Sequence, residues 1–98
     1  MKLNKVAEGG MLTVALSGRL DTTTAPELEK EISSSLAGVN ALVLDFSDLD
    51  YVSSAGLRVI LKAQKAMNAK GGMKLKNVNK DIMEVFDITG FVDILTIE

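Results

Sequence analysis

Four apolar residues, Ala41-Leu42-Val43-Leu44, follow one another near the middle of the chain without a polar residue between them. Such a run is typical of a central strand covered on both faces, because a half-exposed strand alternates apolar with polar side chains. The polar segment from Asp45 to Asp50 comes next and is expected to be irregular. We therefore expect a sheet built around residues 41–44, with helices against it.

Patterns of strand and helix alternate on both sides of this run. Residues 3–8 and 11–16 flank Gly9-Gly10, which predicts a β-hairpin. The spacing of apolar residues predicts helices from Thr24 to about Leu36, from Ser53-Ser54 to Gly71-Gly72 and from Asn79 to Gly90, with short strands at 73–76 and 92–97. This order predicts an α/β fold, in which one domain spanning 1–98 has a mixed β-sheet with helices packed against it.

The ends of two helices carry recognisable signals. Thr24 is expected to cap the first helix while Glu27 reaches back to its amide, and Pro26 stands where a missing N–H costs nothing. Asn79 and Gly90 are expected to be the cap and the stop of the last helix.

The chain of 98 residues contains neither cysteine nor histidine. This removes the most common general base and the usual transition-metal ligands, so we expect no enzyme, no metal site and no cofactor. No apolar run is long enough to cross a bilayer, and a net charge of -2 offers no footprint for nucleic acid. We expect a soluble, cytoplasmic protein that neither inserts into a membrane nor binds nucleic acid.

Ser53 and Ser54 stand where the expected irregular segment meets a helix. A hydroxyl at that position can cap the helix, a contact worth about 1 kcal/mol. It can also be phosphorylated, because a phosphate there would face unpaired amides and the positive end of the helix dipole. The residues alone leave both roles open.

The segment Tyr51-Val52-Ser53-Ser54-Ala55-Gly56-Leu57 resembles the signature of the STAS domain family, the anti-sigma factor antagonists. In that signature an aromatic and an aliphatic residue precede a serine-bearing Asp-Ser-Ser/Thr-Gly-Leu run. Residues 16–21 match the family's Leu-x-Gly-x-Leu-Asp element, and residues 86–91 match its late Phe-x-x-x-Gly-Leu/Phe element. Three separate matches occur in the family's order along the chain.

The resemblance implies a STAS-like fold and a switch protein. The unmodified protein would bind an ATP-dependent anti-sigma factor serine/threonine kinase and displace a sigma factor, and phosphorylation of Ser54 would end this binding. Ser53, which stands where the family often has aspartate, is the second choice of phosphoacceptor, and a phosphatase is a further candidate partner. The acidic side chains of Asp45, Asp48 and Asp50 are expected to add negative charge beside Ser54. The partner-binding residues that the resemblance implies are Asp21, Thr22, Ser53, Ser54, Ala55, Gly56, Leu57 and Arg58.

Two other functions stand beside this one. A STAS-fold adaptor would dock on a transporter or signalling complex without being phosphorylated. A protein of another class would hold a nucleotide or lipid at the sheet edge or in a crevice, although no glycine-rich phosphate loop supports this. Arg58 and Lys62 share a helix face and are expected to be solvated, with pairing to acidic groups of a partner as the alternative.

Overall fold

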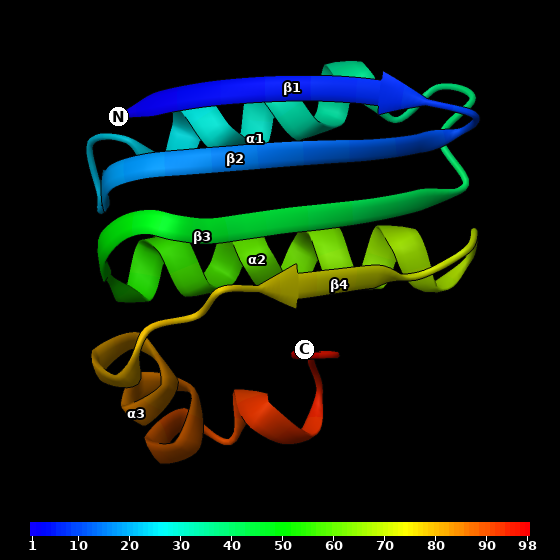
Figure 1. The fold of residues 1–98 in the computed structure, drawn as a ribbon. Coiled ribbons are helices and arrows are strands. Elements are labelled where there is room, and N and C mark those ends of the chain that lie inside the picture. The colour runs from blue at the N-terminus through cyan, green and yellow to red at the C-terminus, as the bar shows by residue number, and fades with distance from the viewer.

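The computed structural model describes all residues from 1 to 98 and contains one four-stranded sheet (Figure 1). The chain forms β1 (Lys2–Glu8), β2 (Met11–Leu20), α1 (Ala25–Ser35), β3 (Ala41–Val52), α2 (Ser54–Asn68), β4 (Met73–Lys76), α3 (Lys80–Thr89) and the short 3-10 helix η1 (Phe91–Asp93). The strands lie in the order β1-β2-β3-β4. The first pair is antiparallel and the other two pairs are parallel, which confirms the expected hairpin and mixed sheet.

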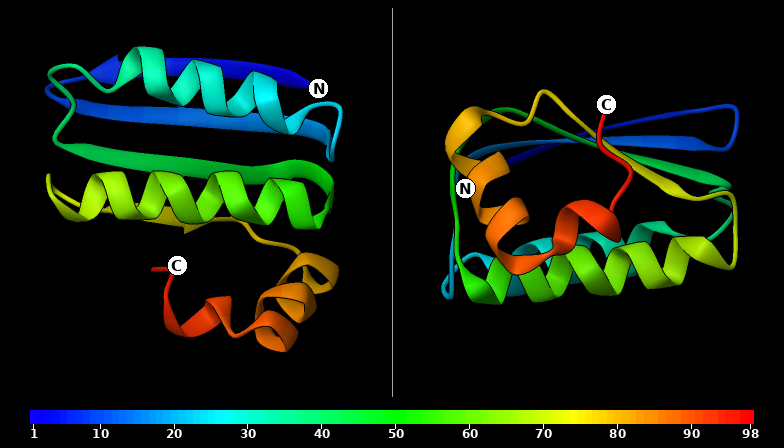
Figure 2. Two further views of the ribbon diagram at one scale, coloured as in Figure 1. Left: turned by 180° about the vertical axis from the view of Figure 1, so that it is seen from behind. Right: turned by 90° about the horizontal axis from the view of Figure 1, so that it is seen from below.

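The helices cover one face of the sheet, as the two views of Figure 2 show. Helices α1 and α2 lie side by side on that face, and α3 lies beyond β4 at the edge of the sheet. Along β3, Leu42, Leu44 and Phe46 are buried beneath the helices, whereas Ala41 and Val43 point to the other face and remain partly exposed. The expectation that this strand is covered on both faces was therefore wrong. Alanine and valine fit a half-exposed position, so a short apolar run cannot tell one covered face from two.

Strand β3 continues through the polar segment that was expected to be irregular. Its pairing with β2 runs from Ala41 to Val52, with register shifts between Ala15 and Ser17 and between Gly18 and Arg19. Phe46, Leu49 and Val52 remain buried along it. The bulges change the alternation of side chains, and for this reason residues 45–50 do not show the period of two that marks a strand.

The expected last strand at 92–97 was also wrong. Gly90 ends α3 with φ +80°, and the chain then turns through η1, where the amides of Ile94 and Leu95 donate to Phe91 O at 2.9 Å. Only Ile97 pairs with β4, through a single parallel bridge to Leu75. Backbone turn bonds thus use the amides of residues 93–95, and only Thr96 O and the amide of Glu98 bond to Leu75 of the sheet.

The predicted signals at the ends of α3 are confirmed, whereas at the start of α1 the position of Pro26 is confirmed and the side-chain cap by Thr24 is not. Asn79 Oδ1 accepts from Ile82 N at 2.9 Å, and Gly90 adopts the left-handed conformation that stops a helix. Thr24 makes no side-chain cap bond, because its backbone is already helical and its hydroxyl donates to Arg19 O at 2.7 Å. Pro26 lies in the first turn as expected.

Candidate partner-binding site

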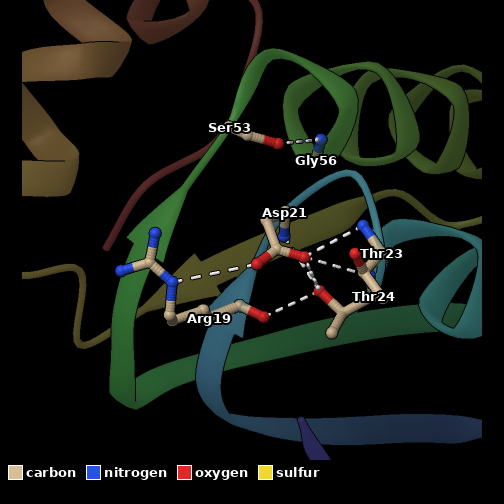
Figure 3. A network of polar contacts seen from close by, with 6 residues as sticks. All are labelled: Arg19, Asp21, Thr23, Thr24, Ser53 and Gly56. Atoms are coloured by element: carbon tan, nitrogen blue, oxygen red, sulfur yellow. Dashed lines mark hydrogen bonds and ion pairs between the residues drawn. The ribbon is translucent and has the colours of Figure 1, made fainter.

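Strands β2 and β3 are parallel, so their carboxyl ends meet at the same edge of the sheet. Leu20 lies opposite Val52, and the amide of Ser53 donates to Leu20 O at 2.8 Å. Each strand passes almost at once into a helix, β2 through residues 21–24 and β3 through Ser53 alone. The turn at Asp21 and the start of α2 are consequently neighbours, although more than thirty residues of chain separate them (Figure 3).

Ser53 caps α2. Its backbone is extended, and its Oγ accepts from Gly56 N at 3.3 Å (Figure 3). The helix bond from Leu57 N to Ser53 O, at 2.9 Å, starts at the same residue. Ser53 is half-buried, and its hydroxyl oxygen is hydrogen-bonded to the backbone. Ser53 therefore has the capping role, one of the two roles that the sequence left open.

Ser54 is the first residue of α2 and is exposed. Its hydroxyl takes part in no hydrogen bond within the protein. The two neighbouring serines therefore differ in kind, because one oxygen holds the helix start together and the other is free in solvent. Ala55, the next residue, is half-buried and has no hydroxyl.

Gly56 allows α2 to approach β2 closely. A Cβ built at this residue would lie 2.7 Å from Leu20 Cγ and 3.1 Å from Leu20 O. Leu57, beside it, is 7% exposed and belongs to the core. Gly56 and Leu57 are buried and position the start of α2 against the sheet. The accessible surface there belongs to their neighbours Ser54 and Arg58.

The turn that enters α1 is organised by Asp21. Its Oδ1 accepts from Thr23 N at 3.0 Å and from Thr24 N at 3.1 Å (Figure 3). The amide of Asp21 in turn donates to Thr24 Oγ1 at 2.8 Å. The Thr24 N–H is the main cause that lowers the pKa of the Asp21 carboxyl below its usual value of 3.8. Asp21 thus stays ionised at neutral pH, and Thr22 is exposed on the same turn.

Arg19 is a residue of this edge that the sequence analysis did not assign to the site. Its Nε lies 3.8 Å from Asp21 Oδ2, and its guanidinium carbon lies 4.2 Å from the centre of the Tyr51 ring. Arg19 faces Tyr51 across the parallel pair. A bulge precedes this pair, so the spacing of residues in the sequence could not predict the contact between Arg19 and Tyr51.

Arg58 is exposed on α2 and forms no ion pair, whereas Lys62, four residues further on, pairs with Glu29 of α1. The predicted site residues therefore come together in two adjacent segments. Thr22, Ser54 and Arg58 are exposed, Asp21, Ser53 and Ala55 are partly covered, and Gly56 and Leu57 are buried.

The expected acidic surroundings of Ser54 are only partly present. Asp45 lies opposite Lys76 of β4. It stands seven residues before Val52, the last residue of β3, so at the rise of a strand Asp45 is about 20 Å from the end that carries Ser54. Its Oδ1 accepts from Asn77 Nδ2 at 2.9 Å and from Ser47 N at 3.0 Å, and the Asn77 bond is the main cause that lowers its pKa. Asp48 and Asp50 are exposed further along the strand. Asp45 therefore belongs to the middle of the sheet.

The edge shows none of the features of other kinds of site. No three acidic side chains gather closely enough to hold a metal ion. The surface hollows of the molecule are lined by other residues, and none includes Asp21, Ser53 or Ser54. None of the helices combines the length and the apolar character that crossing a bilayer requires.

Comparison with known sequences gives a family and close relatives. The STAS domain family matches residues 2–98. BtrV of Bordetella bronchiseptica is 37% identical over 99 residues, an alignment that covers 99% of this chain and 85% of BtrV. The anti-sigma-B factor antagonist of Bacillus subtilis is 31% identical over 87 residues, covering 88% of this chain and 80% of that protein.

Solved structures share the fold. The crystal structure of an anti-sigma factor antagonist from Mycobacterium paratuberculosis superposes with a TM-score of 0.88 at 24% identity, covering 98% of this chain and 83% of that one. The Bacillus cell fate determinant SpoIIAA, solved in its phosphorylated form, gives a TM-score of 0.76 at 19% identity, with 99% and 91% covered. The four-stranded mixed sheet with its helices is thus a fold that these proteins have in common with this chain.

Proposed function

This chain belongs to the STAS domain family, and from that premise we propose that it is a switch controlled by phosphorylation of Ser54. It acts as an anti-sigma factor antagonist, a class of regulators that are not enzymes. In the unphosphorylated form it binds an anti-sigma factor serine kinase, and the sigma factor held by that kinase is released. Such a switch operates on transcription and therefore in the bacterial cytoplasm.

The observation that carries the proposal is the difference between the two serines. Ser54 is exposed at the first position of α2 with a free hydroxyl, while the oxygen of Ser53 is used by the helix cap. A kinase needs an accessible hydroxyl that it can draw into its own active site. Ser54 meets this need without disturbing the start of α2, and Ser53 does not.

The reaction is transfer of the γ-phosphoryl group of ATP. A bond forms between Ser54 Oγ and the γ-phosphorus, the bond from that phosphorus to the β–γ bridging oxygen breaks, and ADP leaves. The hydroxyl proton passes to a base of the kinase. A phosphatase that hydrolyses the ester would restore the hydroxyl and reset the switch.

The phosphate would end binding through its charge. It adds about -1.5 to -2 at neutral pH, at an edge where the half-buried Asp21 carboxylate is already ionised. A partner that docks there without a cation of its own must remove this charge from water. Leaving a charge poorly paired in an interface costs on the order of 2 to 5 kcal/mol, or roughly thirtyfold to several-thousandfold in affinity.

Mass spectrometry tests the proposal directly. The protein and its Ser54→Ala variant are incubated with ATP and each candidate anti-sigma factor kinase from the same genome, with Ser53→Ala as the matched control. We expect one added phosphate on the protein and on the Ser53→Ala variant, and none on Ser54→Ala. Fragment spectra should place the phosphate on Ser54.

A different pattern would contradict the switch. If Ser54→Ala is still phosphorylated and Ser53→Ala is not, the phosphoacceptor is Ser53. If one candidate binds stably and none modifies the protein, the chain acts as an adaptor and Ser54 is only the first residue of a helix.

A further inference from the structure

We propose that Arg58 is the intramolecular counter-ion of phosphorylated Ser54. Phosphorylation would then act twice, adding negative charge to the edge and withdrawing a cation that the unmodified surface offers to an acidic partner. The inference rests on the proposed switch at Ser54 and names how the two states of that surface differ.

The geometry of α2 brings the two side chains together. Arg58 follows Ser54 by four residues in the same helix, and both are exposed. Residues four apart lie one above the other on a helix face, with their Cβ atoms about 6 Å apart. Helical side chains lean toward the amino-terminal end, so the long arginine side chain reaches back over the turn that begins at Ser54.

Arg58 is also free to take this role. It forms no ion pair, and the residues three and four positions from it in α2 are Ser54, Ala55, Leu61 and Lys62, none of them acidic. The other nearby cations already have partners. Arg19 lies between Asp21 and the Tyr51 ring, and Lys62 pairs with Glu29.

The chemistry of the pair favours the phosphorylated state. A guanidinium matches two phosphate oxygens with two parallel N–H donors, which a lone ammonium cannot do. A phosphate on Ser54 would also face the amides at the start of α2, which have no partner within the helix. The doubly charged phosphate gains more from these contacts than the singly charged one. Arg58 should therefore make the phosphate a stronger acid.

Phosphorus NMR of the full chain tests this. Phosphoserine is placed at position 54 during synthesis, by genetic code expansion, in the otherwise unchanged protein and in the Arg58→Gln and Lys65→Gln variants. Lys65 is the matched control, because it is exposed on α2 but lies about 16 Å along the helix from Ser54. Circular dichroism confirms that all three chains are folded.

The phosphate's second acid dissociation constant should be about threefold or more larger in the parent than in Arg58→Gln. Lys65→Gln should match the parent within experimental error. Equal constants in the parent and Arg58→Gln would overturn the inference, and so would an equal loss in both variants, which would reveal only a general effect of charge. This experiment uses no kinase. A kinase that fails to modify Ser54 would therefore count against the switch but would not change what the NMR measurement says about Arg58.

Discussion

Gly56 shows how a single missing side chain fixes the candidate site. The start of α2 lies against Leu20 so closely that no larger residue fits, and this contact holds the serines beside the Asp21 turn. The same scale explains Asp45, whose carboxylate accepts two hydrogen bonds in the middle of the sheet. Each of these residues gives a prediction that one substitution can test.

The Gly56→Ala variant should be less stable than the parent. Alanine is a better helix former than glycine by about 1 kcal/mol, but its Cβ would lie 2.7 Å from Leu20 Cγ and 3.1 Å from Leu20 O. Overpacking of this kind costs roughly 1 to 3 kcal/mol, and we expect the clash to prevail. Thermal unfolding should show a lower Tm.

A double-mutant cycle with Leu20→Ala identifies the cause. If Gly56→Ala acts through the Leu20 side chain, the loss in the double variant should be smaller than the sum of the two single losses by at least about 0.5 kcal/mol. Strictly additive losses, or a Gly56→Ala variant that is more stable than the parent, would show that the clash with Leu20 does not control the helix start.

Asp45 should make stability depend on pH. Its folded pKa lies below the usual value of 3.8, with the hydrogen bond from Asn77 as the main cause. The ionised carboxylate therefore stabilises the fold above about pH 4, and this contribution is lost as the pH falls through the folded value. We expect the parent to be more stable than Asp45→Asn at pH 7 and the difference to shrink at pH 3, in urea unfolding.

Asp48→Asn serves as the control for this titration, because Asp48 is exposed and its side chain accepts no hydrogen bond. Its difference from the parent should stay small at both pH values. A gap between the parent and Asp45→Asn that is as wide at pH 3 as at pH 7 would contradict the assigned role of the carboxylate.

At the scale of elements, α2 begins at a half-buried cap and presents an exposed residue next to it. Ser53 supplies the cap through Gly56 N, and Ser54 supplies the hydroxyl that faces solvent. The element can therefore carry a modification at its first residue without losing its start. A cation one turn later, at Arg58, lies on the same stretch of helix surface.

The Ser53→Ala and Ser54→Ala variants should differ in their free energy of unfolding. Ser53→Ala removes the cap and should cost about 1 kcal/mol, whereas Ser54→Ala removes a hydroxyl without partners and should change stability by no more than about 0.5 kcal/mol. Urea unfolding of both variants checks the ranking. Equal losses, or a larger loss for Ser54→Ala, would mean that the hydroxyl of Ser54 holds the helix.

At the scale of the whole molecule, the site depends on two parallel strands that end together. Strands β2 and β3 belong to the middle of the sheet, and α1 and α2 leave from the same edge to cover one face (Figures 1 and 2). The opposite face keeps Val6 and Met11 exposed, at 62% and 43% of their surfaces. The molecule is thus a two-layer structure with its candidate site at one end.

The sequence by itself determined most of the elements and their order, because local signals act over a few residues. Asn79 and Gly90 marked the ends of α3, Gly9-Gly10 marked the hairpin, and the motif from Tyr51 to Leu57 identified the family and the serines. These features depend on hydrogen bonds and backbone angles within one segment. They can therefore be found without knowing which segments become neighbours.

Only the tertiary structure decided which face of β3 is covered, how far that strand continues and which serine is free. The polar residues after Asp45 form a strand because β2 pairs with them, and the bulges in that pairing conceal the alternation. Arg19 meets Tyr51 through the same register, and Thr24 turns toward Arg19 O where it was expected to cap α1. Pairing between β2 and β3 settles the strand and the Arg19–Tyr51 contact, and the Thr24 hydroxyl and the free serine depend on which nearby group the folded backbone offers as a partner.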